Sequence, residues 1–324
     1  MRVSRTRFCA GVIVVVAFCV ALTGSVFPTF AEAFDRMVIF GDSLSDPGNH
    51  FIAFGATSQP PFAPLPDFPY AIGGHHFSNG PTWTEYLSRA LEMPTSGKPA
   101  LRAPGVFTNY AVGRARARAG APEFPQFDLS TQVQRFLTDT GGRVSASPLY
   151  VIWIGANDLD DALIAGQTDP AQATQIIETA VTSVAGNVYA LWAAGARTFM
   201  ILNIPDPALV PFIRALGPAA QAAATQTGML FNGALDAALA QVSGLPDLRI
   251  IRFDVGAVFD RIVATHGYDE LSDVTDPCLT FGVVVRAVCS HPNRYLFWDG
   301  AHPTTAAHRL VAEAAQRRLE DEQG

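Results

Sequence analysis

The clearest pattern along the chain is a series of short apolar runs, each long enough for a buried strand and bounded by turn-forming residues. Five such runs cover residues 37–40, 106–110, 148–154, 198–204 and 248–253. Segments with apolar residues near helical spacing lie between and after them. These segments cover residues 82–91, 170–194, 218–242 and 254–266, and a last helix opens at Pro303. Strands that alternate with helices predict an α/β fold with a mainly parallel sheet.

The first 33 residues have a different character. Three arginines precede a mostly apolar stretch over residues 9–22, and Ala31-Glu32-Ala33 offers a small-residue cleavage site. This arrangement predicts a signal peptide over residues 1–33 and an exported protein, either periplasmic or secreted. The apolar stretch is shorter than the ~20 residues that a membrane-spanning helix needs. An uncleaved N-terminal anchor is the alternative interpretation.

Residues 34–324 are long enough to bury a large core, and they contain no obvious linker and no internal repeat. We therefore expect one domain over this range, with no membrane span after removal of the signal. The formal net charge of the whole chain is −7. An acidic balance argues against nucleic acid as a partner and against simple adsorption to anionic lipid. The oligomeric state is not indicated by the sequence.

Two of the four cysteines belong to the predicted signal, which leaves Cys278 and Cys289 in the exported part. They lie in a loop-like region between two prolines. In an oxidising compartment the simplest interpretation is a disulfide between them. No group of Cys and His residues has the spacing of a zinc site, and the adjacent pair His75-His76 is weak evidence for a metal. We therefore predict no metal and no organic cofactor.

A serine follows the first predicted strand in an abrupt turn. Gly41 and the cluster Asp46-Pro47-Gly48-Asn49 break the chain on either side of Ser43. Open parallel sheets bind ligands outside the carboxyl ends of their strands, which is where this serine lies. Ser43 is accordingly a candidate nucleophile. An ordinary strand-to-helix loop, in which Ser43 caps a helix, is the alternative.

A carboxylate precedes a histidine by three residues near the C-terminus, where the sequence reads Trp298-Asp299-Gly300-Ala301-His302. In one turn of helical or turn-like backbone, residues i and i+3 lie on the same side. Asp299 can then hold one ring nitrogen of His302 and leave the other free for a nucleophile. Taken alone, this spacing also fits a surface turn before the last helix.

These motifs together resemble those of the GDSL or SGNH hydrolases, in particular the branch of plant-type GDSL esterases and bacterial thermolabile-haemolysin or lecithinase-like enzymes. The resemblance covers nearly the whole exported chain. Its blocks match Gly41-Asp42-Ser43-Leu44, Asn109-Tyr110-Ala111-Val112-Gly113, Gly155-Ala156-Asn157-Asp158 and Asp299 to His302, and a further stretch matches residues 77–83. The branch often has a second glycine where this chain has Arg114. The serine motif lacks the Gly-x-Ser-x-Gly elbow of the α/β-hydrolase fold.

The resemblance implies a flavodoxin-like three-layer α/β/α sandwich with a mainly parallel five-stranded sheet. It also implies hydrolysis of a carboxylic ester, of a lipid or a short acyl group, through an acyl-enzyme on Ser43. The oxyanion would be held by the N–H of Ser43, an N–H at Gly113 or Arg114, and the side chain of Asn157. A lipid acyltransferase and a decayed, secreted binding protein are the alternatives.

Two further features of the sequence lie near these motifs. The segment of residues 51–82 is rich in proline and aromatic residues, namely Phe51, Phe54, Phe62, Phe68, Tyr70 and Phe77. These rings either line an apolar pocket or cover the edge of the sheet. Arg114, Arg116 and Arg118 alternate with alanine. They either pair with nearby acids in a solvated loop, which we favour, or meet a phosphate or carboxylate of a substrate.

Overall fold

The computed structural model describes residues 34–55, 70–120, 127–280 and 288–322. The predicted signal peptide, residues 1–33, and the rings of Phe62 and Phe68 lie outside the described residues. Within the described ranges, no helix is both long enough and apolar enough to cross a membrane.

A parallel sheet forms the centre of the molecule, in the order β1-β2-β3-β4. The four strands are β1 (Met37–Gly41), β2 (Leu149–Trp153), β3 (Thr198–Leu202) and β4 (Arg249–Phe253). Every residue of β1 and β2 is buried, as expected for strands that are covered on both faces. The sequence therefore predicted these four strands correctly.

The fifth predicted strand, residues 106–110, is present only as an irregular edge beside β1. Asn109 forms an isolated parallel bridge with Ile39. The N–H of Ile39 donates to Thr108 O at 2.9 Å, and the N–H of Tyr110 donates to Ile39 O at 2.7 Å. With this edge included, the sequence order of the strands across the sheet is 2-1-3-4-5, which is the flavodoxin-like order. The predicted fold is thus confirmed, with the fifth strand reduced to an edge segment that bridges β1 at a single position.

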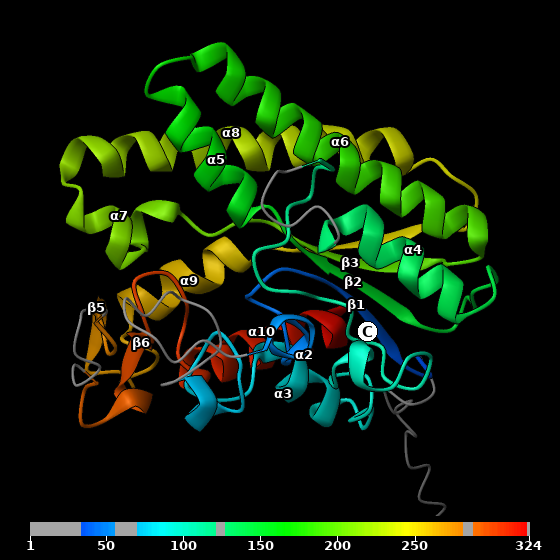
Figure 1. Ribbon diagram of the computed structural model, residues 1–324, viewed down its shortest axis with the longest axis horizontal. Coiled ribbons are helices and arrows are strands. Elements are labelled where there is room, and N and C mark those ends of the chain that lie inside the picture. The colour runs from blue at the N-terminus through cyan, green and yellow to red at the C-terminus, as the bar shows by residue number, and fades with distance from the viewer. Residues whose placement is uncertain (1–33, 56–69, 121–126, 281–287, 323–324) are drawn as a thin grey trace, which may run out of the picture.

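Helices cover both faces of the sheet (Figure 1). On one face lie α4 (Leu129–Asp139), α5 (Ala156–Gly166), α6 (Pro170–Ala194) and α8 (Pro218–Val242). On the other face lie α2 (Asn49–Phe54), α3 (Trp83–Ala90) and α10 (Thr305–Asp321). The arrangement is the three-layer α/β/α sandwich that the resemblance implies. Further elements of the described residues are α7 (Pro211–Ala215), α9 (Val255–Ala264) and the two-stranded sheet of β5 (Asp273–Pro277) and β6 (Tyr295–Phe297). Short 3₁₀ turns lie at Tyr70–Gly73, Ala100–Arg102, Pro207–Leu209 and Pro292–Arg294.

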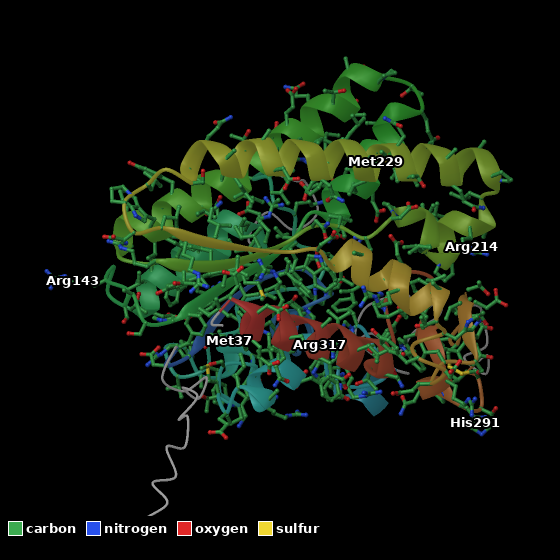
Figure 2. The ribbon with its side chains drawn as sticks, turned by 180° about the vertical axis from the view of Figure 1, so that it is seen from behind. Met37, Arg143, Arg214, Met229, His291 and Arg317 are labelled. Atoms are coloured by element: carbon green, nitrogen blue, oxygen red, sulfur yellow. A yellow bond between two sulfur atoms is a disulfide. The ribbon has the colours of Figure 1, made fainter. Side chains whose placement is uncertain are left out.

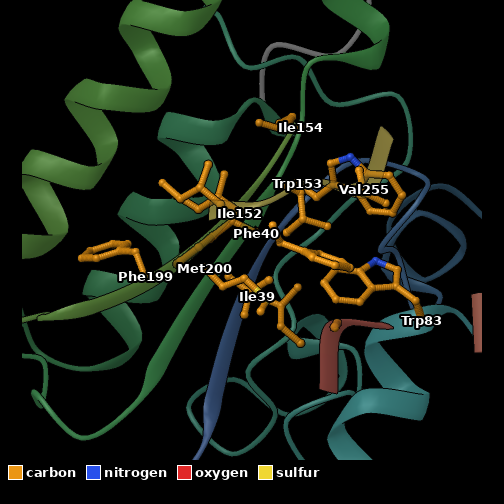
Figure 3. Close-up of a cluster of buried hydrophobic side chains, with 14 of the residues drawn as sticks. Ile39, Phe40, Trp83, Ile152, Trp153, Ile154, Phe199, Met200 and Val255 are labelled. Carbon is orange, nitrogen blue, oxygen red and sulfur yellow. The ribbon is translucent and has the colours of Figure 1, made fainter. Parts of the chain in front are cut away.

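The core between sheet and helices is built from large side chains that the strands point to either face (Figure 3). Trp153 of β2 and Trp83 of α3 meet edge to face, with ring centroids 5.7 Å apart. Phe40 of β1 packs against Phe136 of α4 in the same manner, at 5.8 Å. These contacts anchor a helix of each layer to the sheet, and they fix the carboxyl ends of β1 and β2 relative to each other.

The last helix begins later than predicted. Its first residue is Thr305 rather than Pro303, because Thr304 acts as the N-cap and its Oγ1 accepts the N–H of Ala307. The carbonyl of Pro303 accepts a hydrogen bond from Ser78 Oγ at 2.9 Å. The segment before the helix is thus held in place as an extended connection.

The predicted disulfide between Cys278 and Cys289 is present, and it is visible as the yellow bond near His291 in Figure 2. Cys278 is buried in a small apolar cluster with Tyr70, Leu279 and Trp298, apart from the main core. The backbone N–H of Cys278 donates to Phe297 O at 3.0 Å, and that of Cys289 donates to Cys278 O at 2.8 Å. The bond therefore stabilises the segment that leads from β6 toward Asp299.

Replacing both Cys278 and Cys289 with serine is expected to lower the free energy of unfolding by about 3 kcal/mol, because the denatured chain loses a short cross-linked loop. Urea unfolding of the oxidised wild type and the double variant measures the difference. Reductant should lower the unfolding midpoint of the wild type and leave that of the double variant unchanged. Equal midpoints for the oxidised wild type and the double variant would contradict the expectation.

Candidate active site

Ser43 lies in the turn that follows β1, at the carboxyl edge of the sheet. Asp42 shapes this turn, since its carbonyl accepts the N–H of Ser45 at 3.1 Å and its Oδ1 accepts the N–H of Leu44 at 3.0 Å. Asp46 then accepts backbone N–H groups at the start of α2. The local sequence therefore bends the chain sharply after the strand and presents the Ser43 hydroxyl to a cavity.

His302 and Asp299 complete a hydrogen-bonded series with Ser43. Nε2 of His302 lies 2.9 Å from Ser43 Oγ, and Nδ1 of His302 lies 2.8 Å from Asp299 Oδ2. All three residues are buried, with at most 9% of their surface exposed. The second oxygen of Asp299 accepts the backbone N–H groups of Ala301 and His302 at 2.8 and 2.7 Å. The structure thus brings Ser43 next to His302 and Asp299, although Ser43 and His302 are 259 positions apart in the sequence.

The negative charge of Asp299 and the positive charge of protonated His302 stabilise each other. Burial alone would raise the pKa of Asp299, but His302 and the hydrogen bonds from His302, Tyr70 and Ala301 outweigh it and hold the pKa below its usual range. Burial alone would lower the pKa of His302, but Asp299 holds it above its usual range. Asp299 thus remains an anion, and His302 is a stronger base than an isolated imidazole.

Asp42 is a buried carboxyl group close to this series. Burial raises its pKa to about 7, although the Leu44 N–H and the nearby His302 act in the opposite direction. Among the described residues, its Oδ2 has no hydrogen-bond partner. A group with this pKa is partly protonated at neutral pH, so Asp42 adds less than a full negative charge beside His302.

The Gly113 backbone N–H was one candidate oxyanion donor, and the structure gives it another partner. It donates to Asp46 Oδ2 at 2.7 Å within the protein. A different constraint explains the glycine: a Cβ at this position would lie 2.0 Å from Cε2 of Phe77. The Gly113 N–H thus already has an acceptor within the protein, and its role as an oxyanion donor stays a prediction. The alternative at Arg114, which adopts a left-handed backbone with φ of 68°, stays a prediction.

Asp46 is a structural residue of the site that the sequence did not reveal. Its carboxylate accepts four backbone N–H groups, from Gly48, Asn49, His50 and Gly113. Burial raises its pKa to about 6, while these four bonds act to lower it. The carboxylate thereby joins the serine turn to the segment around Gly113. A short acidic residue just before a Pro-Gly turn was the only available signal.

Asn157 lies in the first turn of α5, directly after β2. Its Nδ2 donates to Ala115 O at 2.9 Å, which leaves the second N–H of the amide available for another acceptor. Asn157 lines the same cavity as Ser43 and His302. The bond to Ala115 fixes the orientation of the amide at the carboxyl edge of the sheet, as an oxyanion donor requires.

Two of the three arginines pair with acids of α5. Arg118 contacts the fully buried Asp158 at 2.7 Å and Asp161 at 2.5 Å, while Arg116 contacts Asp161 at 2.9 Å. The pairing with nearby acids that we favoured is therefore confirmed for Arg116 and Arg118. The loop is not solvated at these positions, because both arginine side chains are largely buried. These ion pairs tie the segment after Gly113 to the helix that carries Asn157.

The cavity beside Ser43 has a volume of about 140 Å³ and walls that are mainly apolar. Its apolar side chains come from β2, α5, the segment between β3 and α7, α7 itself, α9 and β6. They include Trp153, Leu159, Ile204, Leu209, Val210, Phe212, Ile213, Phe259 and Phe297. Phe51, Phe54, Tyr70 and Phe77 do not line it. Phe77 instead packs against the His302 ring, with centroids 5.2 Å apart. The aromatic rings described in residues 51–82 are therefore no part of this cavity wall.

A serine, a histidine and an aspartate that are hydrogen-bonded in series at the carboxyl edge of a flavodoxin-like sheet define a Ser-His-Asp site of the SGNH type. The model of the family described as "GDSL-like Lipase/Acylhydrolase" matches residues 37–315. This chain belongs to that family, and the resemblance drawn from the motifs is confirmed.

Several curated proteins are similar to this chain in sequence. Thermolabile hemolysin of Vibrio parahaemolyticus is 28% identical over 87% of this chain, which spans 63% of that protein. Lipase 1 of Photorhabdus luminescens is 30% identical over 56% of this chain, but only 24% of that protein is spanned. GDSL esterase/lipase At1g71691 of Arabidopsis thaliana is 26% identical over 86% of this chain and 80% of its own length. The chain thus spans less than two thirds of the first two relatives.

A solved structure of an inhibitor-bound aryl esterase from M. smegmatis is similar to this chain with a TM-score of 0.40. It is 16% identical in sequence, and the match covers 88% of this chain and 98% of that one.

Proposed function

We propose that this protein is a serine esterase or lipase that hydrolyses carboxylic esters through an acyl-enzyme. The hydrogen-bonded series from Ser43 through His302 to Asp299 carries this proposal, because it supplies a nucleophile, a base and a group that orients the base. Family membership supports ester hydrolysis as the reaction. We further propose export by the signal of residues 1–33, and a single hydrolase domain over residues 34–324.

In the first step, His302 takes the proton of Ser43 Oγ as this oxygen attacks the ester carbonyl. Asp299 stabilises the imidazolium that forms, at 2.8 Å from its Nδ1. His302 then gives the proton to the departing alcohol, and the acyl group stays on Ser43. In the second step, His302 takes a proton from water as the water oxygen attacks the acyl-enzyme. His302 then returns this proton to Ser43 Oγ as the acid leaves.

The negative charge on the carbonyl oxygen needs donors that are already in position. We assign this role to the backbone N–H of Ser43 and to the side-chain amide of Asn157, which the Ala115 carbonyl holds at 2.9 Å. The apolar cavity walls would accept the hydrocarbon part of the ester, and Asp160 in the same cavity disfavours an anionic group. A neutral lipid or short acyl ester fits these walls best.

A panel of p-nitrophenyl esters of increasing chain length, combined with labelling by a fluorophosphonate probe, tests the proposal. We expect hydrolysis of at least one ester and labelling of Ser43 by the probe. Hydrolysis measured with added glycerol separates the acyltransferase alternative, which would yield a glyceryl ester. Absence of both labelling and hydrolysis would favour the binding-protein alternative.

Replacing Asn157 with alanine is expected to lower kcat by about 10²- to 10³-fold with a small change in KM, because the amide acts on charge that develops only in the transition state. Steady-state kinetics on a neutral ester measures both constants. Asn203→Ala is the matched control, since Asn203 follows β3 and its amide binds Asp254 at 2.7 Å. A near-normal kcat for Asn157→Ala would remove this residue from the mechanism.

A further inference from the structure

A fourth side chain reaches the catalytic acid from a distant part of the sequence. The hydroxyl of Tyr70 donates to Asp299 Oδ2 at 2.6 Å, across 229 positions. Tyr70 is fully buried. Oδ2 is also the oxygen that lies 2.8 Å from His302 Nδ1. The tyrosine and the histidine therefore share Oδ2. His302 Nδ1 also lies 3.0 Å from Oδ1, which accepts the backbone N–H groups of Ala301 and His302.

The ring of Tyr70 is fixed by its neighbours. It packs edge to face on Trp298, with centroids 6.2 Å apart, and it lies in the apolar cluster that contains Cys278 and Leu279. The N–H of Leu279 donates to Trp298 O at 2.6 Å, so the disulfide segment, Trp298 and Tyr70 form one packed unit. A hydroxyl on so constrained a ring limits the rotation of the carboxylate that it binds.

We propose that Tyr70 is a positioning residue that holds Asp299 in place for His302, so that the series of hydrogen bonds has four members rather than three. This inference rests on the proposed function. Burial and the neighbouring Asp299 keep the pKa of Tyr70 well above its usual range, so its hydroxyl remains a donor under all conditions in which the site could act.

The Tyr70 hydroxyl also influences the pKa of His302, the base that accepts the proton of Ser43. A hydrogen bond to Oδ2 draws negative charge away from the side of the carboxylate that faces His302. Without it, Asp299 attracts the imidazolium more strongly, and the pKa of His302 rises. Because the base must be neutral to accept the proton of Ser43, the acid limb of the pH profile then moves to higher pH. The other charged or titratable groups near His302 are Asp42, Asp160 and His308, and a change at Tyr70 leaves all three in place.

Tyr70→Phe is the test, because it keeps the packed ring and removes only the hydroxyl. We expect kcat to fall about tenfold, which is typical of a lost hydrogen bond to a charged group, with KM within about twofold. We also expect the acid limb of the pH profile of kcat/KM to move to higher pH by roughly half a unit. Tyr295→Phe is the matched control, since Tyr295 packs on the same apolar cluster and is not a donor to Asp299. This control should change neither kcat nor the acid limb.

A double-mutant cycle shows whether Tyr70 acts through Asp299. In the Asp299→Ala background, Tyr70→Phe should have no further effect on kcat. An NMR titration of the His302 ring in Ser43→Ala protein reports the same shift without any catalysis, so a failed inference and a failed proposed function are distinguishable. An unchanged His302 titration in Tyr70→Phe, or an equal loss of kcat with and without Asp299, would overturn the inference.

Discussion

Replacing Ser43 with alanine is expected to abolish ester hydrolysis, with kcat lowered by at least about 10³-fold, while the protein stays folded. The substitution removes the oxygen that would form the proposed acyl-enzyme. The structural loss is small, because Ser43 Oγ contributes the hydrogen bond to His302 Nε2 at 2.9 Å and little packing. Active-site titration with a fluorophosphonate and kcat on a neutral ester measure the effect.

Ser45→Ala is the matched control for this substitution. Ser45 lies two residues further along the same turn and is fully buried, and its Oγ accepts the indole N–H of Trp83 at 3.0 Å. Its loss should lower the thermal unfolding midpoint, because it leaves a buried donor unpaired, yet the folded fraction should keep its kcat. Ser43→Ala protein that retains more than about a tenth of the wild-type kcat would refute the nucleophile assignment.

The long helices and the contact between Asp299 and His302 were predictable because short-range patterns determine them. Helices α6 and α8 begin with Pro170 and Pro218 and end at the predicted residues, since proline at the first position and apolar periodicity both mark a helix. Asp299 reaches His302 through the predicted spacing of three residues. Each of these inferences required only the residues within a few turns of the chain.

The features that the sequence did not reveal depend on contacts between distant segments. Tyr70 binds Asp299 across 229 positions, and Asp46 binds the N–H of Gly113 across 67. No local pattern marks either pair. The surroundings of Gly113 were hidden for the same reason: the resemblance identified the glycine, but only the packing of Phe77 shows why a side chain does not fit there. Helix α5 was also missed, because its first turn coincides with the Asn157 motif.

Replacing His302 with alanine is expected to lower kcat about as far as Ser43→Ala does, by at least about 10³-fold. Without the ring, none of the described residues offers Ser43 Oγ a base within hydrogen-bonding distance, and the hydroxyl stays protonated at neutral pH. Asp299→Ala should also lower kcat strongly, and it should destabilise the fold as well. It leaves the Tyr70 hydroxyl and the backbone N–H groups of Ala301 and His302 without their acceptor. Kinetics and thermal unfolding of both variants separate these two effects.

The decisive measurement is the double variant Ser43→Ala/His302→Ala. Residues that act in one step are strongly non-additive, so the double variant should be no slower than either single variant. His266→Ala is the control for the loss of a histidine, because His266 is exposed after α9 and belongs to no part of the site. His266→Ala should leave kcat unchanged in the wild type, and it should not change the kcat of Ser43→Ala when the two substitutions are combined. Losses that multiply in the double variant would mean that Ser43 and His302 act in separate steps, and the 2.9 Å contact between them would then have no catalytic role.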